Sequence, residues 1–133
     1  MQRCIKYTFC SRELWLMYNG AAMFALRELH DNVKGLFDAI GSDTPEGTDA
    51  LVTAFRILAE NGNAARKYIG YDTAELPTAD EIAALSTVHD LSRMRNAVAS
   101  AVVAGLGQEI TSENKEEEID LGLEELNAKK KTH

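Results

Sequence analysis

A helical apolar repeat in the second half of the sequence limits the possible folds more than any other feature. Between Thr87 and Gly105, apolar side chains recur every three or four positions, at Val88, Leu91, Met94, Val98 and Ala101 or Val102. This spacing places them on one face of an α-helix. Alanines fill much of the remaining surface, so neighbouring helices can approach closely. We expect one helix over residues 86–105, the longest element of the fold.

Weaker patterns of the same kind predict helices over residues 20–30, 33–40, 45–61 and 78–85, with one or two further turns over 64–69. Asn19 is a plausible cap of the first of these helices, and Thr78 and Glu81 have the spacing of a capping box. The triplet Asn61-Gly62-Asn63 is expected to end the third helix. The fold class is therefore mainly α, a bundle of about five helices. Its expected core comprises Leu26, Leu29, Phe37, Phe55, Leu58, Leu91, Met94 and Val98.

A small β-hairpin is expected before the helices. Residues 4–10 are rich in aromatic and β-branched types and place Ile5, Tyr7 and Phe9 on one face of a strand. Residues 14–18 form a second run that alternates between two faces, and the polar residues 11–13 separate the two runs. An isolated hairpin is marginally stable in water, so it must pack on the helices. Helix over residues 12–29 is the rival interpretation. Trp15 and Tyr18 are candidate partner-binding residues, although burial between hairpin and helices is the favoured alternative.

The composition changes after Gly107, which divides the chain into a helical domain, residues 1–107, and an acidic tail, residues 108–133. The domain has 13 acidic and 10 basic residues, and the tail has 8 and 4. Such charge runs are usually solvated, so we expect a flexible tail that is dispensable for folding and needed for partner capture. Its apolar residues fit a strand or a helix, and they could bind a partner or dock on the domain itself: Ile119, Leu121, Leu123 and Leu126.

No catalytic, cofactor or metal motif is found in the sequence. None of the three histidines has a second His or Cys at the spacing of metal ligands, and no glycine-rich phosphate loop is present. Cys4 and Cys10 lie too far apart on one extended strand for a disulfide, so we expect free, buried thiols. We therefore expect a protein that is not an enzyme and that needs no cofactor.

Charge and hydropathy exclude two classes of partner. The net charge of −7 opposes binding to nucleic acid, because most non-specific affinity comes from neutralising phosphates. The most apolar stretch, residues 97–106, is too short to span a bilayer, and residues 1–10 lack the apolar region of a signal peptide. We expect a cytoplasmic protein whose partners are other proteins.

The order of segments resembles tail assembly chaperones of long-tailed bacteriophages and prophages of Gram-positive bacteria. The resemblance lies in residues 14–26, 51–62, 65–72, 91–98 with 105–107, and 118–123. These segments carry patterns of helix packing, since the family has no catalytic residues.

The resemblance implies a small, mostly helical protein of the host cell cytoplasm, in the short, non-frameshifted form. Such a protein binds the tape measure protein, and a longer frameshifted form recruits tail tube subunits. A generic helical adaptor or regulator encoded in a mobile element is the alternative, and the neighbouring genes would separate the two hypotheses. Oligomeric state is not predicted by the sequence.

Overall fold

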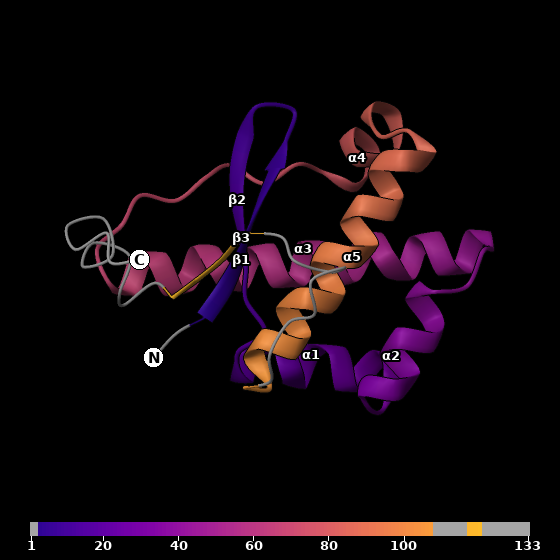
Figure 1. Cartoon of the computed structure of the whole chain (residues 1–133), viewed down its shortest axis with the longest axis horizontal. Coiled ribbons are helices and arrows are strands. Elements are labelled where there is room, and N and C mark those ends of the chain that lie inside the picture. Colours follow the sequence, from indigo (N-terminus) through magenta and orange to yellow (C-terminus); the bar gives the residue numbers. More distant parts are fainter. Residues whose placement is uncertain (1–2, 108–116, 121–133) are drawn as a thin grey trace.

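The computed structural model describes the backbone of residues 3–107 and 117–120, and the side chains of residues 4–107. In this part of the chain the fold is mainly helical with an N-terminal hairpin, which confirms the predicted fold class (Figure 1). The elements are β1 (Arg3–Phe9), β2 (Arg12–Leu16), α1 (Gly20–His30), α2 (Val33–Ile40), α3 (Pro45–Tyr68), α4 (Ala79–Leu85), α5 (Val88–Gly105) and β3 (Glu117–Asp120).

The hairpin turns over two residues. Phe9 pairs with Arg12, and the intervening Cys10 and Ser11 have φ of 48° and 70°. Two successive left-handed residues are typical of the turns that match the twist of a hairpin. The turn therefore begins one residue before the predicted polar break at residues 11–13 and shares only Ser11 with it, since Arg12 and Glu13 belong to β2.

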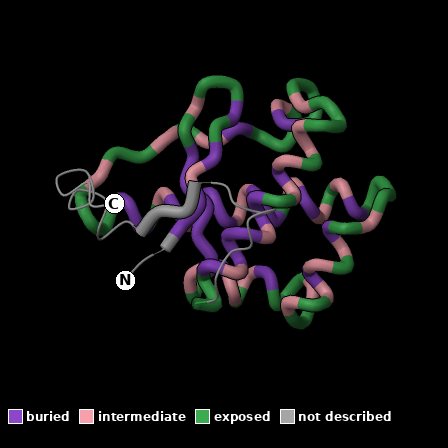
Figure 2. Tube along the Cα trace, viewed as in Figure 1, coloured by how far each residue is buried: buried purple, intermediate pink, exposed green. Residues whose placement is uncertain are grey.

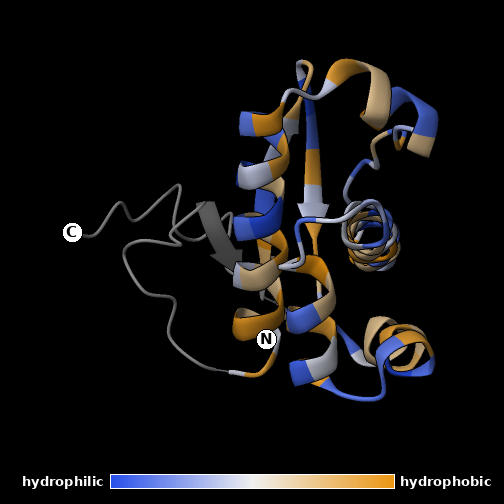
Figure 3. Cartoon of the chain, turned by 90° about the vertical axis from the view of Figure 1, so that its right-hand side faces the viewer, coloured by the Kyte–Doolittle hydropathy of each residue, from blue (hydrophilic) through white to orange (hydrophobic). Residues whose placement is uncertain are grey.

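One face of the hairpin is buried in the main core, and the other is buried only at the end away from the turn, in a smaller cluster. Ile5, Tyr7 and Phe9 face the main core together with inward residues of β2, as the alternation predicted. The opposite face contributes Cys4, Trp15 and Met17 to a smaller cluster. The strands pack on helices from two sides, β2 on α3 and β1 on α5 (Figures 1 and 3). The hairpin is thus stabilised by the helices, as expected.

A third strand comes from the segment that was expected to be a flexible tail. β3 runs antiparallel to β1, with Cys4 opposite Ile119 and Lys6 opposite Glu117. The sheet order is β2-β1-β3. At least four residues of the tail therefore extend the sheet.

The helix α3 corrects two predictions. It runs unbroken through Asn61-Gly62-Asn63, where the sequence predicted its end, and with 24 residues it is longer than α5, which has 18. Gly62 is buried against the backbone of Trp15, and the Met17 N–H donates to the Leu58 carbonyl over 3.1 Å. Packing against β2 thus overrides the local turn propensity.

The core agrees with prediction at most positions. Leu26, Phe55, Leu58, Met94 and Val98 are buried, and Phe37 and Leu91 are partly buried against the core. Figure 2 shows the buried positions gathered along the hairpin and the inner faces of α3 and α5, with α4 largely exposed.

Two predicted burials are wrong. Leu29 is 55% exposed, because the buried residues of α1, Ala22 and Leu26, end before its last turn. Cys10 is exposed because it lies in the hairpin turn. Cys4 is buried, and neither cysteine forms a disulfide.

Candidate functional site

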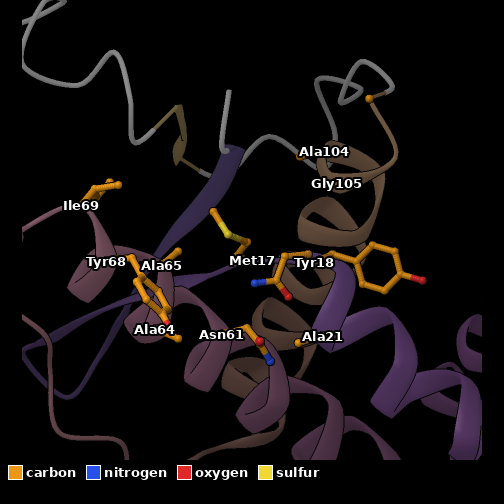
Figure 4. Close-up of a pocket in the computed structure, with 12 residues that line it drawn as sticks. Met17, Tyr18, Ala21, Asn61, Ala64, Ala65, Tyr68, Ile69, Ala104 and Gly105 are labelled. Atoms are coloured by element: carbon orange, nitrogen blue, oxygen red, sulfur yellow. The ribbon is translucent and has the colours of Figure 1, made fainter.

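A hollow of about 590 Å³ opens where the C-terminal ends of α3 and α5 meet the end of β2. In Figure 4, Ala64, Ala65 and Tyr68 come from α3, Ala104 and Gly105 come from α5, and Met17 lies between these two groups. We call this site the α3–α5 hollow. It is lined by Met17, Tyr18, Asn19, Ala21, Asn61, Ala64, Ala65, Tyr68, Ile69, Ala104, Gly105 and Gly107.

The lining of the α3–α5 hollow is uncharged and largely apolar. Its two amide side chains are already engaged within the fold. The Asn19 side chain accepts from the Ala22 N–H at 2.9 Å, and the Asn61 side chain donates to the Ile57 carbonyl at 2.8 Å. The site therefore fits an apolar ligand, such as a row of aliphatic side chains.

Small residues create this space. The end of α5 lies so close to the residues that follow β2 that a β-carbon on Gly105 would overlap the carbonyl oxygen of Tyr18. On the α3 side, Ala64 and Ala65 carry only methyl groups, and Ala104 does the same on α5. Two helix ends are thus held against the same strand end, and their small side chains leave the gap between them unfilled.

Exposed apolar side chains line the hollow or lie next to lining residues in the sequence. Tyr68 is 92% exposed, Ile69 is 44% exposed, and Leu106, next to Gly105, is 47% exposed. Single exposed apolar residues are normal, but several of them at one hollow are characteristic of a binding surface. The hollow and this rim together form the strongest candidate site in the described part of the chain.

The two aromatic candidates from the sequence have different positions. Tyr18 lines the hollow, although only 7% of the residue is exposed, and its ring lies against Gly105. Trp15 is buried beneath Arg66, whose guanidinium carbon lies 3.6 Å from the ring centroid, and Tyr71 stacks on the same guanidinium at 4.7 Å. Trp15 is therefore part of the core, as the favoured alternative proposed.

The structure brings one of the four candidate tail residues into the described fold. Ile119 lies in β3, opposite Cys4 in the register. Leu121, Leu123 and Leu126 lie outside the described residues.

Among the described residues, Glu81 and Asp90 have shifted pKa values, and both cap the starts of helices. The Thr78 backbone N–H lowers the pKa of Glu81, and the Arg12 guanidinium, 3.2 Å away, lowers it further. The Thr87 backbone N–H lowers the pKa of Asp90. These groups stabilise the starts of α4 and α5 through two capping boxes.

Within the described residues, no group of three or more His, Cys, Asp or Glu side chains is arranged to hold a metal ion. None of the helices described combines the length and the apolar character needed to cross a bilayer.

Sequence reasoning did not find the α3–α5 hollow. The useful signal was present, because Ala64 and Ala65 follow a glycine that was assigned to a helix end, and Ala104 precedes Gly105. Recognising the site also requires knowing that both segments meet the end of β2, which is information about long-range packing.

Comparisons with known proteins gave no relative for this chain. No protein-family model matches it, and neither any curated protein nor any solved structure does.

Proposed function

We propose that this chain is a non-enzymatic tail assembly chaperone of a bacteriophage or prophage, which holds an apolar helical segment of the tape measure protein in the α3–α5 hollow. The observation that carries the proposal is the uncharged hollow with its exposed apolar rim. The resemblance of the sequence to this family supplies the identity of the partner.

The chemistry of the hollow suits such a client. A tape measure protein is a long apolar helical chain, which aggregates unless its surface is covered. An amphipathic helix binds by laying its apolar face into a groove, and Tyr68 and Ile69 extend the apolar surface beyond the hollow. The net charge of −7 helps to keep the loaded complex in solution.

Co-expression with the tape measure protein of the same phage or prophage tests this function. We expect the chain to keep the tape measure protein in the soluble fraction and to co-purify with it. Ala64→Asp places a charge at an exposed position of the hollow and should abolish both effects. Ala84→Asp, the same change at an exposed position on α4, is the matched control.

Two results would contradict the proposal. One is a tape measure protein that stays insoluble beside the wild-type chain. The other is equal capture by the Ala64→Asp and Ala84→Asp variants. Capture of a different helical protein from the same gene neighbourhood, with the same sensitivity to Ala64→Asp, would favour the adaptor hypothesis. Recruitment of tail tube subunits, assigned by the resemblance to a longer form, needs its own co-purification.

A further inference from the structure

We propose that the chain's own residues 121–126 dock in the α3–α5 hollow and compete there with any partner. The regulatory meaning of this self-docking rests on the proposed function, but the docking itself can be measured with no partner present.

Strand direction brings the segment to the correct end of the sheet. β2 and β3 both run antiparallel to β1, so they are parallel to each other and finish at the same end. The residues that follow β2 are Met17, Tyr18 and Asn19, all of which line the hollow. β3 ends at Asp120, opposite Arg3, at that same end of the sheet.

The distance from the end of β3 to the α3–α5 hollow is short. In the register, Ile119 faces Cys4, and Cys4 is one position beyond the Ile5–Leu16 pair, which places it beside Met17. Strands lie about 4.8 Å apart, so Ile119 and Met17 are separated by two strand spacings, about 10 Å. Six residues reach about 20 Å when extended. Residues 121–126 can therefore cover the hollow without disturbing β3.

The two surfaces are complementary. Leu121, Leu123 and Leu126 are the apolar residues of the segment, and the hollow offers methyl groups and no charge. Glu124 and Glu125 fall between these leucines, and the last turn of α3 carries the exposed Lys67 beside the rim. Burying three leucines offsets part of the entropy lost on ordering the segment. Because the tether through β3 makes the binding intramolecular, the effective concentration is high.

A spin label on the full-length chain tests this docking. Asn127→Cys carries the label in a Cys10→Ser background, because Cys10 is exposed whereas Cys4 is buried. If the docked state is the major one, amide peaks of Tyr68 and Gly105 should weaken about twofold or more relative to the reduced label. Amide peaks of α4 should keep their height.

Matched variants test whether the weakening of the amide peaks depends on the leucines of residues 121–126 and on the α3–α5 hollow. Replacing Leu121, Leu123 and Leu126 together by Ser should remove the weakening, whereas replacing residues 129–131 by Ser should leave it. Ala64→Asp should remove it, and Ala84→Asp should not. The self-docking is refuted by unweakened peaks in the labelled parent. Weakening that survives both the leucine replacement and Ala64→Asp also refutes it.

A mixing experiment distinguishes docking within one chain from docking between copies. Isotope-labelled chain without spin label is mixed with spin-labelled chain at natural isotopic abundance. Peak heights that stay constant support docking within the chain, and weakened Tyr68 and Gly105 peaks overturn it in favour of exchange between copies. Failure of the tape measure experiment leaves these readouts unaffected, so the two proposals fail separately.

Discussion

The carbonyl of Trp15 lies directly against the α-carbon of Gly62, with no space for a β-carbon between the strand β2 and the helix α3. Two residues beyond Trp15, the Met17 N–H donates to the carbonyl of Leu58, one helical turn before Gly62, at 3.1 Å. The strand edge and the helix backbone thus touch directly, and this contact fixes the position of the hairpin on α3.

Gly62→Ala should therefore destabilise the protein, although alanine favours helices. The added methyl group meets backbone atoms, which cannot rotate away, and overpacking of this kind costs about 1–3 kcal/mol. Gly20→Ala is the control, because a β-carbon at Gly20 meets nothing within 4 Å. Urea denaturation of both variants measures the difference, and equal free energies of unfolding would contradict the close contact.

Phe55→Ala should lower the free energy of unfolding by about 3–5 kcal/mol, the usual cost of removing a buried aromatic side chain. Phe55 has no exposed surface, and its ring centroid lies 5.3 Å from that of Tyr7 in an edge-on contact. Phe24→Ala is the matched control, since Phe24 is 67% exposed and its loss should change stability by less than about 0.5 kcal/mol. A small effect at Phe55 would contradict the central position of α3.

Arg66→Met should destabilise the protein by about 2 kcal/mol, because it removes a buried cation from between the rings of Trp15 and Tyr71. Trp15 is the only tryptophan of the chain, so its fluorescence emission reports directly on this contact. Lys67→Met, at the exposed neighbouring position, should leave both stability and emission unchanged. Unaltered emission in Arg66→Met would show that the stacking is absent in solution.

The stability of the protein should fall in acid, in part through Glu81. Hydrogen bonds from Thr78 and Arg12 lower the pKa of this carboxyl below its ordinary value of 4.5 in the folded state. The resulting stabilisation is present above the unfolded pKa and is lost as the pH falls through the lower folded pKa. The melting temperature of Glu81→Gln should therefore lie below that of the wild type at pH 7 and approach it as the pH falls through the lowered pKa of Glu81.

Glu60→Gln, on the exposed surface of α3, is the control for the acid series. An identical pH dependence of melting in Glu81→Gln and the wild type would mean that the capping box and the Arg12 pair do not form.

Shortening the chain from its C-terminal end should show that β3 contributes to stability and that the residues after it do not. A chain ending at Asp120 keeps the pairing of β3 with β1, and it should melt as the full chain does. A chain ending at Gly107 loses that pairing, and we expect a lower melting temperature and faster hydrogen exchange of β1 amides. This outcome differs from the expectation, based on charge alone, that all of residues 108–133 are dispensable for folding. Equal melting of the three chains would restore that expectation.

The predictions that the structure confirms depend on interactions between residues close in the sequence. The capping box of Thr78 and Glu81 involves neighbouring residues, and the alternation of the hairpin follows from strand geometry, so both are visible in the sequence. Asn61-Gly62-Asn63 was misleading because the contact of Gly62 with Trp15 joins segments 47 positions apart. The pairing of β3 with β1 spans more than 110 positions, and no local pattern encodes it. The α3–α5 hollow was missed for the same reason.

The sheet order β2-β1-β3 has a consequence for biosynthesis. The ribosome makes the central strand first and one edge strand last, with all five helices of the described fold in between. Until residues 117–120 have been translated, one edge of β1 has unpaired N–H and C=O groups, which can template pairing with another nascent chain. Completing translation thus shields that edge. A chain released before residue 117 would keep the helices but expose one unpaired edge of β1 to other chains.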